Sequence, residues 1–204
     1  MLKTTTAVDW HQQLVEQLRW HWDGQLRPRL DGITDEEYHW APVPDSWDIR
    51  LRSESGQAVQ LGSGDWTCDF VAPEPEPAPV TTIGWRIAHL VVGVFGARAA
   101  AHFDATFEWG VPDYEHWPYA GNAAEGMRQL DATYRAWLDG ISGLTLDDLS
   151  RQVGDAEGPW ATHSMAELVL HINREAIHHG AEIALLRDLY LRLHNAVGAT
   201  PASG

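Results

Sequence analysis

Four segments of the chain repeat apolar residues every three or four positions, which is the pattern of a helix that buries one face. The segments run from about Thr5 to Leu26, over residues 81–107, from Ala123 to Leu138, and from about Ser164 to His194. Helices with one apolar stripe bury it against one another. The pattern therefore predicts an all-α fold, a four-helix bundle, in one domain that spans residues 1–204.

Polar and small residues mark the ends of these helices. Thr81 or Thr82 can cap the second helix, because a threonine side chain accepts hydrogen bonds from the first free N–H groups. Ser164 opens the sequence "SMAE", which has the Ser-x-x-Glu form of a capping box. Gly140 follows the third helix, and we expect that helix to end before it.

A long connection separates the first two helices. The sequence "RPRLDGITDEEYHWAPVPDSW" contains proline and glycine, which exclude a continued helix. Residues 47–71 include "WDIRLR" and "DWTCDF", two short mixed runs that can pair as a hairpin. The Pro-rich "APEPEPAPV" then predicts an extended tether. We therefore expect an irregular or hairpin insertion at about residues 42–80.

The fourth helix carries polar residues where leucines are expected, in "HINREAIHHGAEIALLRDLY", residues 171–190. At about 100° per residue, His179 lies at the centre of the apolar stripe and Glu175 about 40° to one side. Glu182 lies slightly further round on the same side. His178 and His171 fall about 80–100° away, at the flank of the stripe. Of the two adjacent histidines, His179 is predicted to face inward.

The second helix places His89 on its apolar face as well. A buried carboxylate is costly unless it is paired or bound to a cation. Glu175 and His179 at i and i+4, with His89 from a facing helix, would form a three-ligand set for a divalent metal with coordination positions left open. However, a single inward histidine is also typical of a core residue with one hydrogen bond, and a Glu-x-x-x-His pair is typical of a salt bridge. Spacing alone leaves these interpretations open.

The amino-acid composition disfavours several classes of binding partner. With 29 acidic and 14 basic residues, the formal net charge is −15, which disfavours nucleic acid and anionic membrane surfaces. The longest apolar stretch, residues 87–101, is too short for a membrane span, and no secretory signal is expected at the N-terminus. Cys68 is the single cysteine, so no intramolecular disulfide forms, which fits a cytoplasmic location and a small packed residue. The surplus of aromatic residues is compatible with a homodimer.

The stretches "TTIGWRIAHL" and "HINREAIHHGAEIALLRDLY" resemble the DinB/YfiT-like superfamily of bacterial helical-bundle proteins. The resemblance implies a divalent metal, zinc or nickel above all, held by His89, Glu175 and His179. Many members have histidine at the middle position. The set with Glu175 is instead similar to that of mycothiol-dependent maleylpyruvate isomerases. Members of known activity are transferases or isomerases that use mycothiol, bacillithiol or a similar small thiol.

The resemblance predicts an enzyme in which the metal activates a small thiol, such as mycothiol, for transfer to a small electrophile or for its isomerisation. Glu182 would orient a ligand or accept a proton; an ion pair with Arg86 or Arg187 is the alternative. Arg86 would hold a substrate carboxylate or play a structural part. His21 would line the cavity or form a core hydrogen bond. Two other functions stay open: a non-catalytic metal- or ligand-binding stress or resistance protein, and a bundle with an empty site whose role is association.

Overall fold

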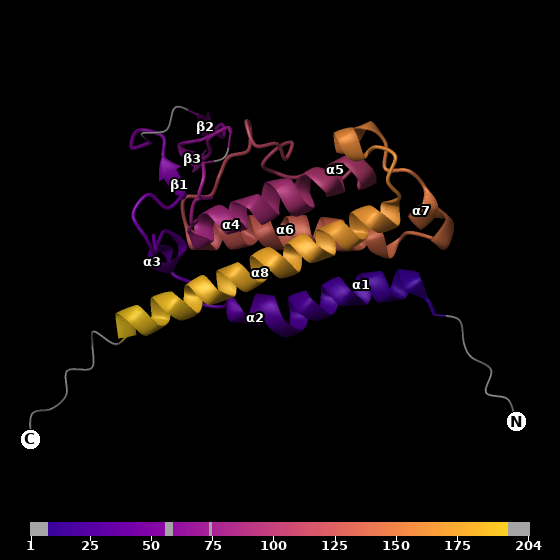
Figure 1. The fold of residues 1–204 in the computed structure, drawn as a ribbon, viewed down its shortest axis with the longest axis horizontal. Coiled ribbons are helices and arrows are strands. Elements are labelled where there is room, and N and C mark those ends of the chain that lie inside the picture. The colour runs from indigo at the N-terminus through magenta and orange to yellow at the C-terminus, as the bar shows by residue number, and fades with distance from the viewer. Residues whose placement is uncertain (1–7, 56–58, 74, 196–204) are drawn as a thin grey trace, which may run out of the picture.

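The structure is a computed structural model and describes residues 8–55, 59–73 and 75–195, which are predominantly helical with one small sheet (Figure 1). The elements in chain order are α1 (Trp10–His21), η1 (Trp22–Leu26), α2 (Arg27–Arg29), α3 (Asp35–Tyr38), β1 (Ile49–Leu51), β2 (Gln60–Leu61), β3 (Trp66–Asp69), α4 (Ile83–His89), η2 (Leu90–Gly96), α5 (Ala97–Phe103), α6 (Ala123–Ser142), α7 (Leu146–Ser150), η3 (Asp155–Trp160) and α8 (Met165–Asn195). The predicted helical fold is thereby confirmed at the level of secondary structure.

The first predicted helix is α1 continued by the π-helical turns of η1 and by α2. Asp9 caps α1, because its side chain accepts the backbone N–H of Gln12 at 3.0 Å. Val8 and Asp9 are not helical, so the predicted helix is wrong at these two positions. Thr5, the predicted first residue, lies outside the described residues.

The second predicted helix is α4, η2 and α5, which follow one another without a break. Thr82 caps α4 by accepting the Trp85 N–H at 3.2 Å, which confirms one of the two predicted caps. The helix ends at Phe103 and not at residue 107, because Asp104 adopts a left-handed conformation with φ of 52°. A residue in that conformation cannot continue a right-handed helix.

The third and fourth predicted helices are α6 and α8. The predicted end of α6 before Gly140 is wrong, since the helix continues to Ser142. Gly140 instead permits a close helix contact: a Cβ there would lie 2.1 Å from the ring of Phe103 on α5. The predicted capping box of α8 is confirmed by the Ser164 N–H, which donates to Glu167 Oε2 at 2.8 Å, and by the Glu167 N–H, which donates to Ser164 Oγ at 3.3 Å.

The insertion forms a three-stranded antiparallel sheet in the order β1-β3-β2. The two runs predicted to pair do so, with Ile49 opposite Cys68. The prediction of a hairpin omitted the third strand, β2, which pairs Leu61 with Cys68 from the other side. Cys68 is buried, as expected for a small packed residue.

The four long helical segments pack against one another around an apolar core. The α4–η2 segment contacts both α6 and α8, and α1 contacts α6 and α8 (Figure 1). Within the core, Trp22 stacks on Tyr134 with ring centroids 3.8 Å apart. The sheet lies at the α4 end of this assembly, where Trp85 Nε1–H donates to the Asp69 carbonyl at 2.8 Å. Among the described residues, no helix combines the length and apolar character needed to cross a membrane.

Candidate metal centre

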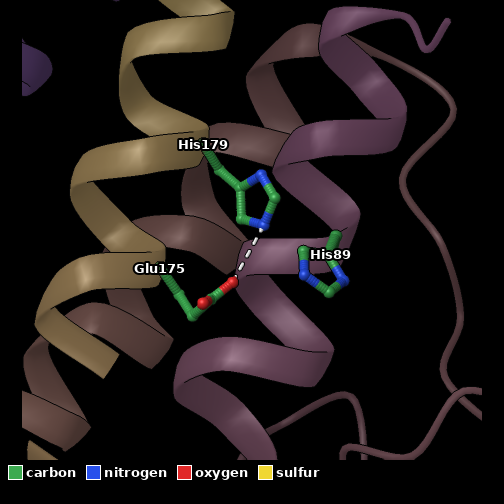
Figure 2. A group of neighbouring side chains, drawn as sticks. All are labelled: His89, Glu175 and His179. Carbon is green, nitrogen blue, oxygen red and sulfur yellow. Dashed lines mark ion pairs between the residues drawn. The ribbon is translucent and has the colours of Figure 1, made fainter. Parts of the chain in front are cut away.

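The three residues predicted as metal ligands lie together between two neighbouring helices. His89 is the last residue of α4, and Glu175 and His179 lie one turn apart on α8 (Figure 2). The rings of His89 and His179 meet nearly at right angles, with centroids 4.7 Å apart. One ligand atom from each of the three residues lies within 4.8 Å of the other two. The fold thus brings two imidazoles and one carboxylate close together.

His179 is held on both sides by carboxylates. Its Nδ1 lies 2.7 Å from Glu182 Oε2. On the other side, its Nε2 lies 3.3 Å from Glu175 Oε2, the ion pair drawn in Figure 2. The shorter contact is a hydrogen bond in which Nδ1–H donates to Glu182. We assign the tautomer from this contact, which leaves the lone pair of Nε2 facing Glu175. A carboxylate that fixes the outer nitrogen is the usual support of a metal-bound histidine.

His89 is held by two aromatic residues. Its Nδ1 lies 2.8 Å from the Tyr114 hydroxyl, and its ring stacks on Trp85 with an interplanar angle of 13°. Nε2 is therefore the nitrogen left for a cation. Gly93 makes this geometry possible, because a Cβ there would lie 1.9 Å from the Tyr114 hydroxyl oxygen.

Tyr114 was missed by the sequence reasoning. It lies in the connection between α5 and α6, 25 residues from His89 in sequence. No helical period relates the two positions. The glycine at residue 93, one turn beyond His89, is a trace of the contact in the sequence, because a larger residue there would displace the Tyr114 hydroxyl.

Burial and nearby cations keep His89 neutral. Removal from water lowers its pKa most, and the electrostatic influence of the neighbouring His179, Arg86 and Arg98 lowers it further, to about 3. At neutral pH the ring therefore carries no proton on one nitrogen. A neutral imidazole is the form that binds metal.

The residues present fit a divalent cation. A tetrahedral zinc ion with bonds of about 2.0–2.1 Å holds neighbouring donor atoms about 3.4 Å apart. The 3.3 Å between His179 Nε2 and Glu175 Oε2 matches that edge. Two lone pairs that face each other at this distance, with 9% of the His179 side chain exposed, need a proton or a cation between them.

A second cluster, formed by His178, His179 and Glu182, has suitable donor atoms but a different environment. Arg86 Nε lies 3.1 Å from Glu182 Oε2, and Arg86 Nη1 lies 3.4 Å from His179 Nδ1. The guanidinium therefore brings a positive charge to the position that a second metal would need, and like charges repel. His178 is 63% exposed, at the flank of the stripe as predicted. Glu182 and Arg86 thus both contact His179 on its Nδ1 side.

Two further residues considered from the sequence, Arg187 and His21, lie apart from the three candidate ligands. Of the two arginines considered as partners of Glu182, Arg86 forms the ion pair, whereas Arg187 pairs with Glu37 at 3.1 Å. His21 packs against Gly180, where a Cβ would lie 2.9 Å from its Nε2. Since residue 180 lies about 100° round α8 from residue 179, His21 belongs to the α1–α8 contact and not to the metal cluster.

One of three comparisons with known proteins identifies the family of the chain. The family model described as the DinB superfamily matches residues 17–183, a range that includes all three candidate ligands. Neither the curated proteins nor the solved structures give a match to the chain. Since the family match covers most of its length, the chain belongs to the DinB superfamily.

Proposed function

We propose that this protein is a divalent-metal-dependent enzyme with the four-helix architecture of its superfamily, and that it activates a small, mycothiol-like thiol. The thiol would then be transferred to a small electrophile or would assist its isomerisation. The observation that carries the proposal is the convergence of two imidazoles and one carboxylate, each imidazole with its second nitrogen already occupied by Glu182 or Tyr114.

His89, Glu175 and His179 would hold the metal, and zinc or nickel suits nitrogen and oxygen donors of this kind. When bound, the metal lowers the pKa of a coordinated thiol, so that the thiolate nucleophile exists at neutral pH. Three protein ligands leave room for such a thiol.

The residues around the three ligands orient them. Glu182 holds the Nδ1 proton of His179 through Oε2, and Arg86 balances its charge. The other oxygen, Oε1, lies 3.5 Å from Nε2 of the exposed His178. Glu182 therefore fixes the tautomer of His179 that would bind the metal through Nε2.

Metal content tests the proposal first. Elemental mass spectrometry of tag-free protein should find near-stoichiometric zinc or nickel in the wild type and in His178→Ala. The metal should be lost in His179→Ala. His178 is the matched control, since it is also a histidine but its side chain is exposed and does not face the three-ligand site.

Thiol consumption is the second measurement. The metal-loaded wild type should consume a small thiol in the presence of electrophiles, and His89→Ala should not. Stoichiometric metal without any thiol consumption would favour the non-catalytic binding protein. No metal in the wild type, even after incubation with zinc or nickel, would refute the metal site itself.

A further inference from the structure

A pocket lies beside the metal cluster, toward the N-terminal end of α8. Its volume is about 450 Å³, which is within the range of small-molecule sites. Residues of α5, η3 and α8 contribute to its walls, among them Arg98, Trp160, Leu168, Leu170, His171 and Arg174. The pocket is separate from the three donor atoms of the cluster.

Glu175 connects the two sites. Its Oε2 faces His179, whereas its Oε1 lies 3.6 Å from His171 Nδ1 and 3.7 Å from Arg174 Nε in the pocket wall. His171 precedes Glu175 by one turn of α8, a rise of about 6 Å. A molecule of modest size in the pocket can therefore present one end to Glu175, at the edge of the three candidate ligands.

The apolar part of the wall comes from Leu168, Leu170 and Trp160. Leu170 is 54% exposed and Trp160 is 62% exposed. The exposure of large apolar side chains to water is unfavourable, so a ligand that covers them would be stabilised. These surfaces suit an apolar ligand body. A sugar-based thiol, which needs hydrogen bonds along its length, fits them poorly.

The charged part of the wall suits an anion. The carboxylate of Glu157 is already engaged by Arg98 at 3.2 Å and His102 at 2.9 Å, and that of Glu167 is engaged in the helix cap. Arg174 is 68% exposed and donates to His171 Nδ1 through Nη2. A guanidinium has five N–H donors, more than these contacts use, and binds carboxylates well.

We propose that this pocket binds the electrophilic substrate of the enzyme, and that this substrate is a small carboxylate with an apolar body. The proposal rests on the proposed function. The carboxylate lies on Arg174, the apolar body lies on Leu168, Leu170 and Trp160, and the reactive carbon extends past Glu175 toward the thiol.

Binding of an unreactive probe tests the pocket without turnover. Calorimetric titration of the full chain, with and without zinc, should show that 4-phenylbutyrate binds both forms. The uncharged 4-phenylbutyramide should bind about tenfold more weakly, as expected for the loss of one charge-assisted contact. Arg174→Ala should remove the preference for the acid, and Leu170→Glu should abolish binding by repulsion.

Matched controls lie further along the same helix. Arg192→Ala and Leu185→Glu change exposed residues of the same types outside the pocket, and both should bind the acid like the wild type. Circular dichroism spectra should show that all four variants fold.

The outcomes separate the pocket from the metal chemistry. If the acid binds only zinc-loaded protein and Arg174→Ala has no effect, the acid is a metal ligand and the pocket proposal is wrong. Equal binding of acid and amide would also overturn it. If the probe binds as expected but no thiol is ever consumed, the pocket stands and the proposed function fails.

Discussion

Replacement of Glu182 tests how far the metal cluster depends on its support. Glu182 accepts the His179 Nδ1–H at 2.7 Å and pairs with Arg86 at 3.1 Å, so Glu182→Ala removes both contacts. It also leaves the Arg86 Nη1 donor 3.4 Å from His179 Nδ1, where it favours the tautomer with the proton on Nε2. That tautomer cannot bind metal through Nε2. Loss of such outer support costs about 10–100-fold in metal affinity.

We expect Glu182→Ala to weaken zinc binding by about 100-fold and Glu182→Gln by about tenfold, since glutamine keeps an acceptor oxygen but not the charge. The ion pair with Arg86 contributes little to this figure, because the Glu182 side chain is one-third exposed. Zinc affinity can be measured by competition with a chromophoric chelator. Asp188→Asn, an exposed acidic position on the same helix, is the control. Unchanged affinity in both Glu182 variants would refute the assigned orientation of His179.

Three further changes test two contacts around His89 and one contact elsewhere in the fold. Tyr114→Phe should weaken zinc binding by up to about tenfold in the same competition assay, and wild-type affinity would contradict its role in orienting His89. Gly93→Ala should displace Tyr114 and lower stability by about 1–3 kcal/mol in urea unfolding, whereas Gly24→Ala, where a Cβ meets nothing within 4 Å, should not destabilise the protein. For His39, burial opposes the charge, but hydrogen bonds to Asp48 and the Gly121 carbonyl raise the pKa above its ordinary value. The charged form thus stabilises the fold below about pH 6.5 and is lost as pH rises through the raised pKa. The stability difference between wild type and His39→Gln should shrink from pH 6 to pH 9, and an increase would refute this assignment.

That the three candidate ligands face the interior of the helices could be predicted from sequence, because each position obeys a local rule. His89 stands on the apolar stripe of its own helix, and Glu175 and His179 are spaced at i and i+4. Such positions depend on helix geometry, which the sequence period already contains. The same argument placed His178 at the flank of the stripe, and its side chain is 63% exposed. Periodicity does not determine whether the apolar stripes of the second and fourth helices face each other. That expectation came from the resemblance to a family.

Features that depend on distant parts of the chain were missed for a physical reason. Gly140 has the local signature of a helix end, yet its lack of a side chain serves the Phe103 contact from another helix. Strand β2 has only two residues, too few to display alternation. Tyr114 reaches His89 from a connection without any period. In each case the tertiary contact, and not the local pattern, selects the residue.

The charges around the cluster connect the metal site with the pocket. Glu175 lies beside Arg174, and Glu182 beside Arg86, so the formal charges of the two carboxylates and the two guanidinium groups cancel. With the proposed divalent cation this region would be positive, and one bound thiolate would not neutralise it completely. On a chain with a net charge of −15, such a region attracts a second anion only at short range, because salt screens charges beyond about 10 Å. If the proposed metal and thiol bind, this charge would favour an electrophile that carries a carboxylate where Arg174 and Glu175 meet.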